Sequence, residues 1–590
     1  MRSAEQILGI IRERGRRGLP LERVYRHLFN PDLHLRAYAR IARNDGATTP
    51  GATAETADGM SQAKIGSVID ALRAERYRWT PARRVHIAKT RGGTRPLGLP
   101  TWSDKLVQEV IRMILEAYYE PQFSPRSHGF RPGRGCHTAL REIHRGWTGT
   151  TWFIEGDISS CFDSLDHEVL LSILAEKIHD GRFLRLVASL LKAGYLEDWR
   201  FGATLSGTPQ GGVVSPMLSN IYLDRLDRFV TVTLIPAYSR GTRRKQNTAY
   251  RRAMLAANRL QREGKAEEAR AFRKIMRTLP TQEPNDEGFR RLRYVRYADD
   301  FLLGFTGPRQ EAEEIKARLR EFLSTELHLE LSEAKTLVTH GRTGAARFLG
   351  YEVSVMHNDR RHTHARLVRR DVNGKIGLRV PRDVVRSKCD PYMRDGKPIH
   401  RPERLNDSEF SIVAGYAVEY RGVVEYYRMA YNLREFGHLR WVMETSMAKT
   451  LAAKLKISVP RVYRRFGTVM ATARGPRKVL RVTVDRGEEK RPLLAQWGAV
   501  PLVRGLDATL NDSPSRVWSH RSELLGRLLA DVCELCGSQD QVQVHHVRHL
   551  ADLERKRGLE KPQWIKVMVA RHRRTLVVCR RCHQGIHGKD

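Results

Sequence analysis

Short apolar runs alternate with longer segments of helical periodicity between about residues 60 and 352. Runs such as Trp152-Phe153-Ile154 and Phe301-Leu302-Leu303 are typical of buried strands, whereas the pattern from Asp104 to Tyr118 is typical of a helix. Because strands and helices follow one another without a regular βαβ repeat, the pattern predicts an α+β arrangement with antiparallel strands.

A second helical block is predicted at about 375–470, and it is rich in tyrosine. Tyr416, Tyr420, Tyr427 and Tyr431 are spaced by four and seven residues, which places them along one helical face. Packing into a core is the simpler interpretation of such a stripe. Arginines interleaved with the tyrosines would also suit stacking on unpaired bases, so both interpretations stay open here.

Basic residues dominate two further stretches. Residues 240–277 form a nearly uninterrupted helical pattern with thirteen basic and three acidic residues. That pattern fits either a solvated helical face or a surface that contacts nucleic acid. Residues 473–514 are basic and predicted to be rich in loops.

The overall charge narrows the choice of partner. The chain has 590 residues, 104 of them Lys or Arg and 66 Asp or Glu, which gives a net charge of +38. At roughly 150 residues per domain this length predicts about three to five domains. A chain of such charge is suited to binding a polyphosphate backbone, because neutralised phosphates release their counterions.

No apolar run is long enough to span a bilayer and no signal-type core opens the chain, so we expect an intracellular protein.

Two acidic residues interrupt the strand pattern at one place. Asp299 and Asp300 stand between the β-prone runs 292–296 and 301–305, which predicts a hairpin with both carboxylates at its turn. Asp157 ends another strand-like run in the same way. Adjacent anions beside apolar strands repel each other and are costly to bury unless a cation is bound, so the pattern indicates a divalent metal site.

The residues around these carboxylates form an ordered series of motifs. The series reads IAKTRGGTRPLGLP, SHGFRPGRGCHTAL, FIEGDISSCFDSLDH, GTPQGGVVSPMLSNIYLDRLD, YADD, LSEAKT, FLGYEV and GYAVEYRGVVEYYRMAYN. In order and spacing it resembles the reverse transcriptases encoded inside group II introns, and the resemblance covers nearly the whole chain. It implies a right-hand polymerase fold divided into an N-terminal basic extension (1–60), reverse transcriptase fingers and palm (61–355), a helical thumb or maturase X region (356–470) and a basic DNA-binding linker region (471–520).

The resemblance assigns roles to individual residues of the polymerase. Asp157, Asp299 and Asp300 are implied to be the catalytic ligands of Mg²⁺. Phe162 matches the aromatic residue that excludes a ribonucleotide 2′-hydroxyl, which implies selection of dNTPs. Four further nucleotide-binding positions are implied: Lys89 and Arg95 for the triphosphate, Gln210 beside the incoming nucleotide, and Lys335 near the departing pyrophosphate.

The last sixty residues carry a separate metal signature. The chain has seven cysteines, and four of them form the pairs Cys533-x-x-Cys536 and Cys579-x-x-Cys582. Two such pairs predict a structural Zn²⁺ site with four thiolate ligands rather than disulfides.

The histidines near these cysteines suggest a second activity. The segments CELC, VHHVRHL and LVVCRRCHQGIHG resemble the HNH, or ββα-metal, nucleases, which implies a zinc-stabilised endonuclease domain at 521–590. The resemblance makes His546 the general base and His545, His583 and His587 the ligands of a divalent ion. The sequence departs from the family at the middle asparagine, whose place is taken by Arg574 or Thr575. A zinc knuckle that only binds DNA is the alternative.

Together these features imply a group II intron-encoded protein that acts as RNA-directed DNA polymerase, splicing cofactor and DNA endonuclease in target-primed retrohoming. Its implied partners are intron RNA, target DNA and dNTPs, and no membrane is expected as a partner. Its implied cofactors are Mg²⁺ and Zn²⁺. We expect it in the bacterial cytoplasm, associated with the nucleoid when it acts on DNA. The sequence leaves its oligomeric state open.

Two other classes of protein remain as alternatives. A maturase that has lost polymerisation should have degenerate carboxylates, but all three aspartates are present. Retron, diversity-generating and CRISPR-associated reverse transcriptases generally lack a maturase-like region joined to an HNH unit.

Overall fold

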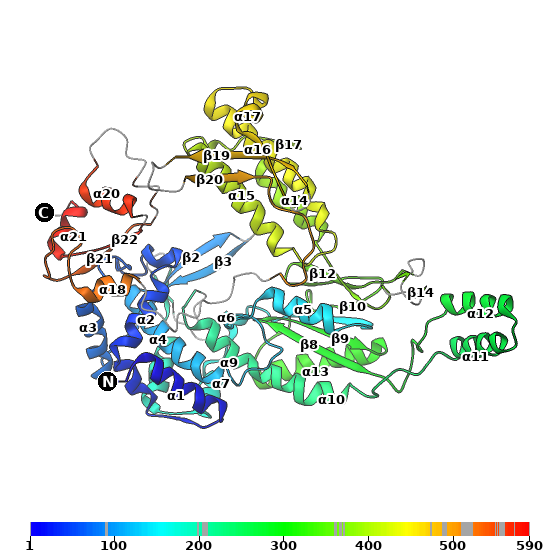
Figure 1. Ribbon diagram of the computed structural model, residues 1–590. Helices are drawn as coiled ribbons and strands as arrows, with labels where there is room; N and C mark the ends of the chain where they lie inside the picture. Colours follow the sequence, from blue (N-terminus) through cyan, green and yellow to red (C-terminus); the bar gives the residue numbers. More distant parts are fainter. Residues whose placement is uncertain are drawn as a thin grey trace.

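The computed structural model describes most of the chain: residues 2–88, 93–197, 200–202, 211–358, 363–364, 368–369, 372–472, 475–485, 492–508, 523–548, 550, 553, 561–571 and 573–588. Figure 1 shows a central body with a mainly helical block above it, the C-terminal unit at one end and a helical hairpin projecting at the other.

The centre of the body is a four-stranded antiparallel sheet, as the sequence predicts. Its order is β10 (Val338–His340), β4 (Trp152–Asp157), β9 (Asp300–Thr306) and β8 (Arg291–Tyr297). Side chains alternate between its faces, so Phe301 and Leu303 belong to one hydrophobic core and Leu302 to another. Burial on both faces explains why β9 reads as a continuous apolar run.

Helices cover both faces of this central sheet. On the face of Leu302 lies α5 (Cys136–Gly146), which contributes Leu140 and Ile143 to that core. The opposite core includes buried residues of α9 (Ser215–Arg228) and α13 (Arg309–Leu327). The central sheet therefore separates two cores.

Helices of the first sixty residues pack into this body. Helix α1 (Ala4–Arg16) begins at a capping box formed by Ser3 and buries the stripe Ala4, Ile7, Leu8 and Ile11. Helices α2 (Pro31–Ile41) and α3 (Gln62–Arg73) join the same core, which is centred on α4 (Trp102–Tyr119). The predicted boundary at residue 60 therefore does not separate two cores.

A second four-stranded sheet is formed by other strands of the chain. It consists of β3 (Thr94–Leu99), β2 (Ala82–Ala88), β6 (Tyr195–Glu197) and β7 (Arg200–Gly202), in that order. Strands β2 and β3 form an antiparallel hairpin in which Arg95 stands opposite Ile87.

The predicted helical block consists of α14 (Arg382–Cys389), α15 (Glu409–Tyr426), α16 (Phe436–Leu455) and α17 (Val459–Phe466). Three of the four tyrosines singled out by spacing lie in its core: Tyr416, Tyr420 and Tyr427 are buried. Tyr431 is 41% exposed. Core packing therefore accounts for most of the stripe.

The expectation that 473–514 is rich in loops is wrong in part. Strands β18 (Gly467–Met470), β19 (Arg477–Val484) and β20 (Leu493–Trp497) form an antiparallel sheet that packs on α15. Apolar side chains of β19 and β20 join the core of the helical block, where the Trp497 ring lies 5.2 Å from that of Tyr420. The basic residues of β19 concealed its strand-like alternation, and the block extends beyond residue 470.

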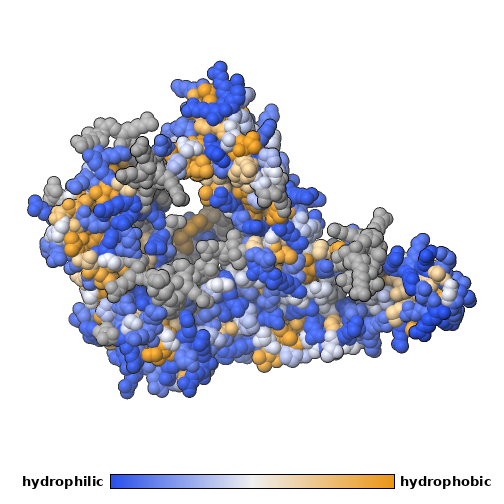
Figure 2. Space-filling model, viewed as in Figure 1, coloured by the Kyte–Doolittle hydropathy of each residue, from blue (hydrophilic) through white to orange (hydrophobic). Residues whose placement is uncertain are grey.

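The basic run 240–277 forms two helices instead of one uninterrupted pattern. Helices α11 (Thr248–Arg262) and α12 (Ala266–Thr278) pack against each other across a turn at Gly264, whose φ is +74°. A positive φ is readily available only to glycine, so the helix ends there. This hairpin projects from the body (Figure 1), and its visible face is largely hydrophilic (Figure 2).

The C-terminal unit has a ββα arrangement. Strands β21 (Gln543–His546) and β22 (Thr575–Val578) pair antiparallel and are followed by α21 (Arg580–Ile586), with α18 (Glu523–Ala530) and α20 (Gln563–Ala570) beside them. Its small core contains Ile565, Met568 and Leu576. Leu528 and Val544 belong instead to the N-terminal core, so the unit is packed against the body.

Shorter elements complete the described part of the chain. They are β1 (Leu21–Glu22), η1 (Val24–Phe29), η2 (Asp45–Thr48), α6 (Cys161–Ser164), α7 (His167–Ala175), β5 (Ile178–His179), α8 (Gly181–Leu191), η3 (Phe229–Leu234), α10 (Ile235–Ala237), β11 (Ala346–Phe348), β12 (Tyr351–Val355), β13 (Thr363–His364), β14 (Val368–Arg369), β15 (Ile376–Arg379), η4 (Asp390–Tyr392), β16 (Met393–Arg394), β17 (Lys397–Pro398), η5 (Pro402–Arg404) and η6 (Leu433–Glu435). Within the described ranges, no helix has both the length and the apolar character needed to cross a bilayer.

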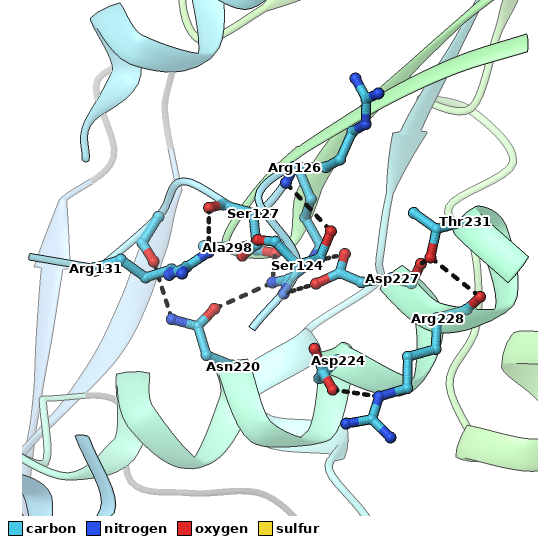
Figure 3. A network of polar contacts seen from close by, with 12 residues as sticks. Ser124, Arg126, Ser127, Arg131, Asn220, Asp224, Asp227, Arg228, Thr231 and Ala298 are labelled. Carbon is cyan, nitrogen blue, oxygen red and sulfur yellow. Dashed lines mark hydrogen bonds and ion pairs between the residues drawn. The ribbon is translucent and has the colours of Figure 1, made fainter. Parts of the chain in front are cut away.

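A fully buried ion pair fixes α9 to the central sheet. Arg296 of β8 donates to both carboxylate oxygens of Asp227 at 2.8 and 2.6 Å, and neither side chain is exposed. Arg296 also donates to Asn220 at 3.1 Å and to the carbonyl of Ala298 at 2.8 Å. Figure 3 shows Asn220 and Asp227 directed toward Ala298, whereas Asp224 on the same helix is directed to Arg228. The pair therefore supports the turn that follows β8.

We predict that Arg296→Met lowers the free energy of unfolding by about 3–5 kcal/mol, because it leaves the Asp227 charge buried without a partner. Arg259→Met is the control: Arg259 also pairs with a carboxylate, that of Glu263, but both side chains are exposed, at 76% and 42%. The control should cost less than about 1 kcal/mol. Urea denaturation measures both, and equal losses would contradict the role given to Arg296.

Candidate functional site

Strand pairing brings the three predicted carboxylates to one end of the central sheet. Asp157, the last residue of β4, stands directly opposite Asp300, the first residue of β9. Directly opposite residues of an antiparallel pair project from the same face. Asp299 lies in the two-residue turn between Tyr297 and Asp300, which pair with each other. The hairpin predicted from the sequence is therefore present.

The turn that holds Asp299 is fixed from two sides. Ala298 has a φ of +55°, which is unfavourable for a residue with a side chain. Its carbonyl accepts the hydrogen bond from Arg296. On the other side the backbone of Gly129 is so close that an added Cβ would lie 2.4 Å from the Ala298 nitrogen, and Asn220 donates to the Gly129 carbonyl at 2.9 Å. The neighbouring elements thus stabilise a strained turn.

The carboxylates disfavour one another's charge. Burial, together with the negative charges of Asp299 and Asp157, raises the pKa of Asp300 to about 7. Burial also raises the pKa of Asp299. Lys335 donates to Asp157 at 2.9 Å, and this hydrogen bond raises the pKa of the lysine. Three oxygen-donor groups with one ammonium nearby fit a site for a hard divalent cation.

An aromatic cluster lies beside the carboxylates. The predicted residue Phe162 contacts Phe130 edge to face, with 6.5 Å between ring centroids, and Phe130 also lies 6.4 Å from Tyr297. Phe130 has a φ of +57° and is 46% exposed. Sequence reasoning missed Phe130, although the neighbouring glycines and proline indicate an irregular backbone that could have drawn attention to it.

The other predicted nucleotide-binding residues are only partly visible. Lys89 and Gln210 lie outside the described residues. Arg95 is exposed on β3. Gly211, which follows Gln210, packs closely on the same strand, since an added Cβ would lie 2.6 Å from the Gly98 carbonyl. This contact places Gly211 next to the β2–β3 hairpin.

In the C-terminal unit the four predicted cysteines converge. The sulfur atoms of Cys533, Cys536, Cys579 and Cys582 all lie within 4.8 Å of one another. Backbone amides of Cys536 and Cys582 point at the first sulfur of each pair, both at 3.5 Å. Four thiolates with such spacing and amide support fit a closed tetrahedral site for zinc.

Three predicted histidines form a second cluster together with a residue that was not predicted. His545, His583 and His587 surround Asp58, and one donor atom from each of the four lies within 4.8 Å of the others. The carboxylate of Asp58 lies 3.2 Å from His545 and His583 and 2.9 Å from His587. No sequence signal could have identified Asp58, because it lies almost five hundred residues before these histidines.

The predicted general base has two partners. The backbone N–H of His546 donates to Asp58 at 2.7 Å, and its Nε2 lies 2.9 Å from the hydroxyl of Tyr38 on α2. Burial lowers the pKa of His546 to about 4, so the imidazole is neutral.

One of the two residues near the place of the family's asparagine lies opposite His546. Thr575, and not Arg574, stands directly opposite His546 in the β21–β22 pair. Its hydroxyl accepts from Arg527 of α18 at 2.9 Å.

Comparison with known families agrees with this division of the chain. Residues 87–249 match the reverse transcriptase (RNA-dependent DNA polymerase) family, residues 384–489 match the type II intron maturase family, and residues 533–583 match the AI2M/AI1M-like HNH endonuclease family. The maturase match crosses residue 470, in agreement with the position of β19 in the helical block.

Relatives of nearly full length decide the family. The chain is 36% identical over 580 residues to the group II intron-encoded protein LtrA of Lactococcus lactis, covering 96% of this chain and 95% of LtrA. The chain belongs to the group II intron-encoded proteins. It is also 33% identical to an uncharacterised 91 kDa protein in a cob intron of Schizosaccharomyces pombe, covering 95% of this chain and 69% of that protein. Likewise, it is 30% identical to a putative COX1/OXI3 intron 1 protein of Saccharomyces cerevisiae, covering 95% and 68%.

The family assignment confirms the function predicted from the sequence. This group II intron-encoded protein combines a reverse transcriptase domain, a maturase domain and an HNH endonuclease domain. The maturase match and the HNH match exclude the alternative of a retron-like or diversity-generating enzyme. The HNH match lies in the C-terminal unit.

We predict that Asp300→Asn stabilises the metal-free protein, and more so at about pH 8 than at about pH 5. The pKa of Asp300 is about 7 in the folded protein against an ordinary value of 3.8. Between these values the unfolded chain loses its proton first, so the wild type loses stability as pH rises, and the penalty is complete above about 7. The neutral amide carries no such penalty.

Thermal unfolding in buffer without Mg²⁺ measures this difference, and added Mg²⁺ should reduce it by stabilising the wild type more than the variant, which keeps two of the three carboxylates. A stabilisation that is independent of pH would contradict the proposed repulsion among the carboxylates.

Proposed function

We propose that the central sheet is the palm of the polymerase and that Asp157, Asp299 and Asp300 hold two Mg²⁺ ions there. The observation that carries this proposal is the cross-strand pairing of Asp157 with Asp300 beside the Asp299 turn. When bound, the ions activate a primer 3′-hydroxyl and stabilise the departing pyrophosphate. In this arrangement Asp157 and Asp299 are the principal ligands and Asp300 completes the set.

Side chains around the carboxylates would bind and select the nucleotide. We assign Lys89, which follows β2 in the sequence, and Arg95 of β3 to the triphosphate, because cationic side chains match its charge. Gln210 would lie beside the incoming base. Lys335, held 2.9 Å from Asp157, would balance negative charge where pyrophosphate leaves. The second sheet would then correspond to the fingers.

The helical block and the basic hairpin would bind intron RNA. The block matches the maturase family and would serve as the thumb that follows the palm. The projecting α11–α12 hairpin carries many of the thirteen basic residues between 240 and 277, and its charge would release counterions from an RNA backbone. The basic residues that follow the helical block would contact the DNA target.

The C-terminal unit would nick the DNA target. His545, His583 and His587 would hold Mg²⁺ against the scissile phosphate, and His546 would accept a proton from the attacking water. The four cysteines would hold Zn²⁺ and support the fold. The nicked strand would then prime copying of the intron, which is target-primed retrohoming, and these substrates would place the protein at the nucleoid in the cytoplasm.

Primer extension on an RNA template tests the polymerase proposal. Asp299→Asn should reduce dNTP incorporation to below about 1% of wild type, because it removes a metal ligand. RNA binding should be unchanged, since backbone contacts do not need that ligand. Asp70→Asn, at a surface ion pair whose carboxylate is 70% exposed, is the control and should extend normally. Extension by Asp299→Asn at the wild-type rate would refute the assignment.

The aromatic cluster gives a second prediction. Phe162→Ala should lower the preference for dNTPs over NTPs by at least about 10-fold, because it vacates the space that a 2′-hydroxyl would occupy. Phe130→Ala should produce a smaller loss, since it only removes the ring that packs against Phe162. Competitive incorporation of matched dNTP and NTP measures both effects. Unchanged selectivity in Phe162→Ala would remove that residue from the role.

A further inference from the structure

Asp58 belongs to the polymerase body, yet its side chain lies among the histidines of the nuclease. It precedes α3 and is held there by the backbone: Gly59 donates to the Val544 carbonyl and Val544 donates to the Met60 carbonyl, both at 2.9 Å. Residues 58–60 therefore lie beside β21 like a short additional strand. The position of the carboxylate is thus fixed by the contact between the two domains.

The contacts of Asp58 resemble a ligand set. Its two oxygens reach His545, His583 and His587 at 2.9–3.2 Å. His545 is 3% exposed, and neither of its ring nitrogens has a hydrogen-bond partner among the described residues, because the approach of Asp58 is outside hydrogen-bond geometry. A buried imidazole without such a partner is costly. A divalent ion between the four groups would satisfy His545.

The number of donors matters for activity. Three imidazoles and one carboxylate supply four ligands, so Asp58 takes up a position on the ion that the substrate could otherwise bind. Asp58 is the one anion of the set, so its carboxylate occupies the kind of position that a phosphate oxygen of DNA would take. Independently, the Tyr38 hydroxyl lies 2.9 Å from Nε2 of His546, where the attacking water would need to bind.

We propose that Asp58 is an exchangeable fourth ligand of the nuclease ion: it closes the site when DNA is absent and gives up its place to the scissile phosphate. In the same closed state the hydroxyl of Tyr38 contacts Nε2 of His546, the proposed general base. The polymerase body thereby restrains the nuclease until a DNA target displaces both side chains. This inference rests on the proposed roles of His545, His583, His587 and His546.

Binding of Mn²⁺ without DNA tests the ligand role. The experiment uses the full-length, zinc-loaded protein carrying Asp299→Asn, so that the polymerase site contributes little, and counts free Mn²⁺ by electron paramagnetic resonance. Asp58→Asn should weaken binding by at least about 10-fold, because an amide is a much poorer ligand. Asp58→Glu should restore part of the affinity and shows that the segment still folds, while Asp70→Asn should change nothing. An unchanged affinity in Asp58→Asn would overturn the proposal.

Nicking tests the closure. At saturating Mn²⁺, ribonucleoprotein containing Asp58→Asn or Tyr38→Phe should nick a supercoiled plasmid with the intron insertion site faster than wild type. Equal or slower nicking by Asp58→Asn would overturn the exchange with phosphate. His546→Ala separates this inference from the nuclease assignment: it should abolish nicking without weakening Mn²⁺ binding. If His546→Ala nicked normally, the assignment of the general base would fail, whereas the Mn²⁺ result would still decide the role of Asp58.

Discussion

Repulsion among three half-buried carboxylates is the constraint on which the proposed polymerase site depends. Asp157, Asp299 and Asp300 lie where burial and mutual charge raise the pKa of two of them, so folding alone would drive them apart or protonate them. Their positions are kept by the register of the sheet and by the buried pair of Arg296 with Asp227. The same pair connects the strained turn to α9, which explains why a costly buried charge is retained close to the site.

The packing also joins the C-terminal unit to the core of the body. The N-terminal helices lie on α4 and, on another side, contact the C-terminal unit, whose Leu528 and Val544 join their core. Tyr38 and Asp58 come from this junction and reach the nuclease histidines. The junction therefore does more than connect two domains, because any movement of the nuclease away from the body must also change the surroundings of its histidines.

The sequence predicted the elements that depend on local pattern. The hairpin with Asp299 at its turn, the antiparallel central sheet and the cysteine cluster all follow from alternation or spacing within short segments. The prediction failed at β19, where basic residues concealed the strand periodicity. It also failed at Gly264, where one glycine ends a helix. Asp58, Tyr38 and Phe130 could not be predicted, because their roles arise only from tertiary contacts between segments distant in the chain.

The central claim is that the register of the sheet and the buried Arg296–Asp227 pair keep the carboxylates in positions where they bind divalent ions. Anomalous X-ray diffraction at the manganese edge, from crystals of the protein with an RNA template, a DNA primer and Mn²⁺, tests it most directly. The account predicts anomalous density in contact with the carboxylates of Asp157 and Asp299, and its loss in Arg296→Met if that variant still crystallises. Manganese density elsewhere, with none at these two aspartates in a complex that extends its primer, would contradict the account.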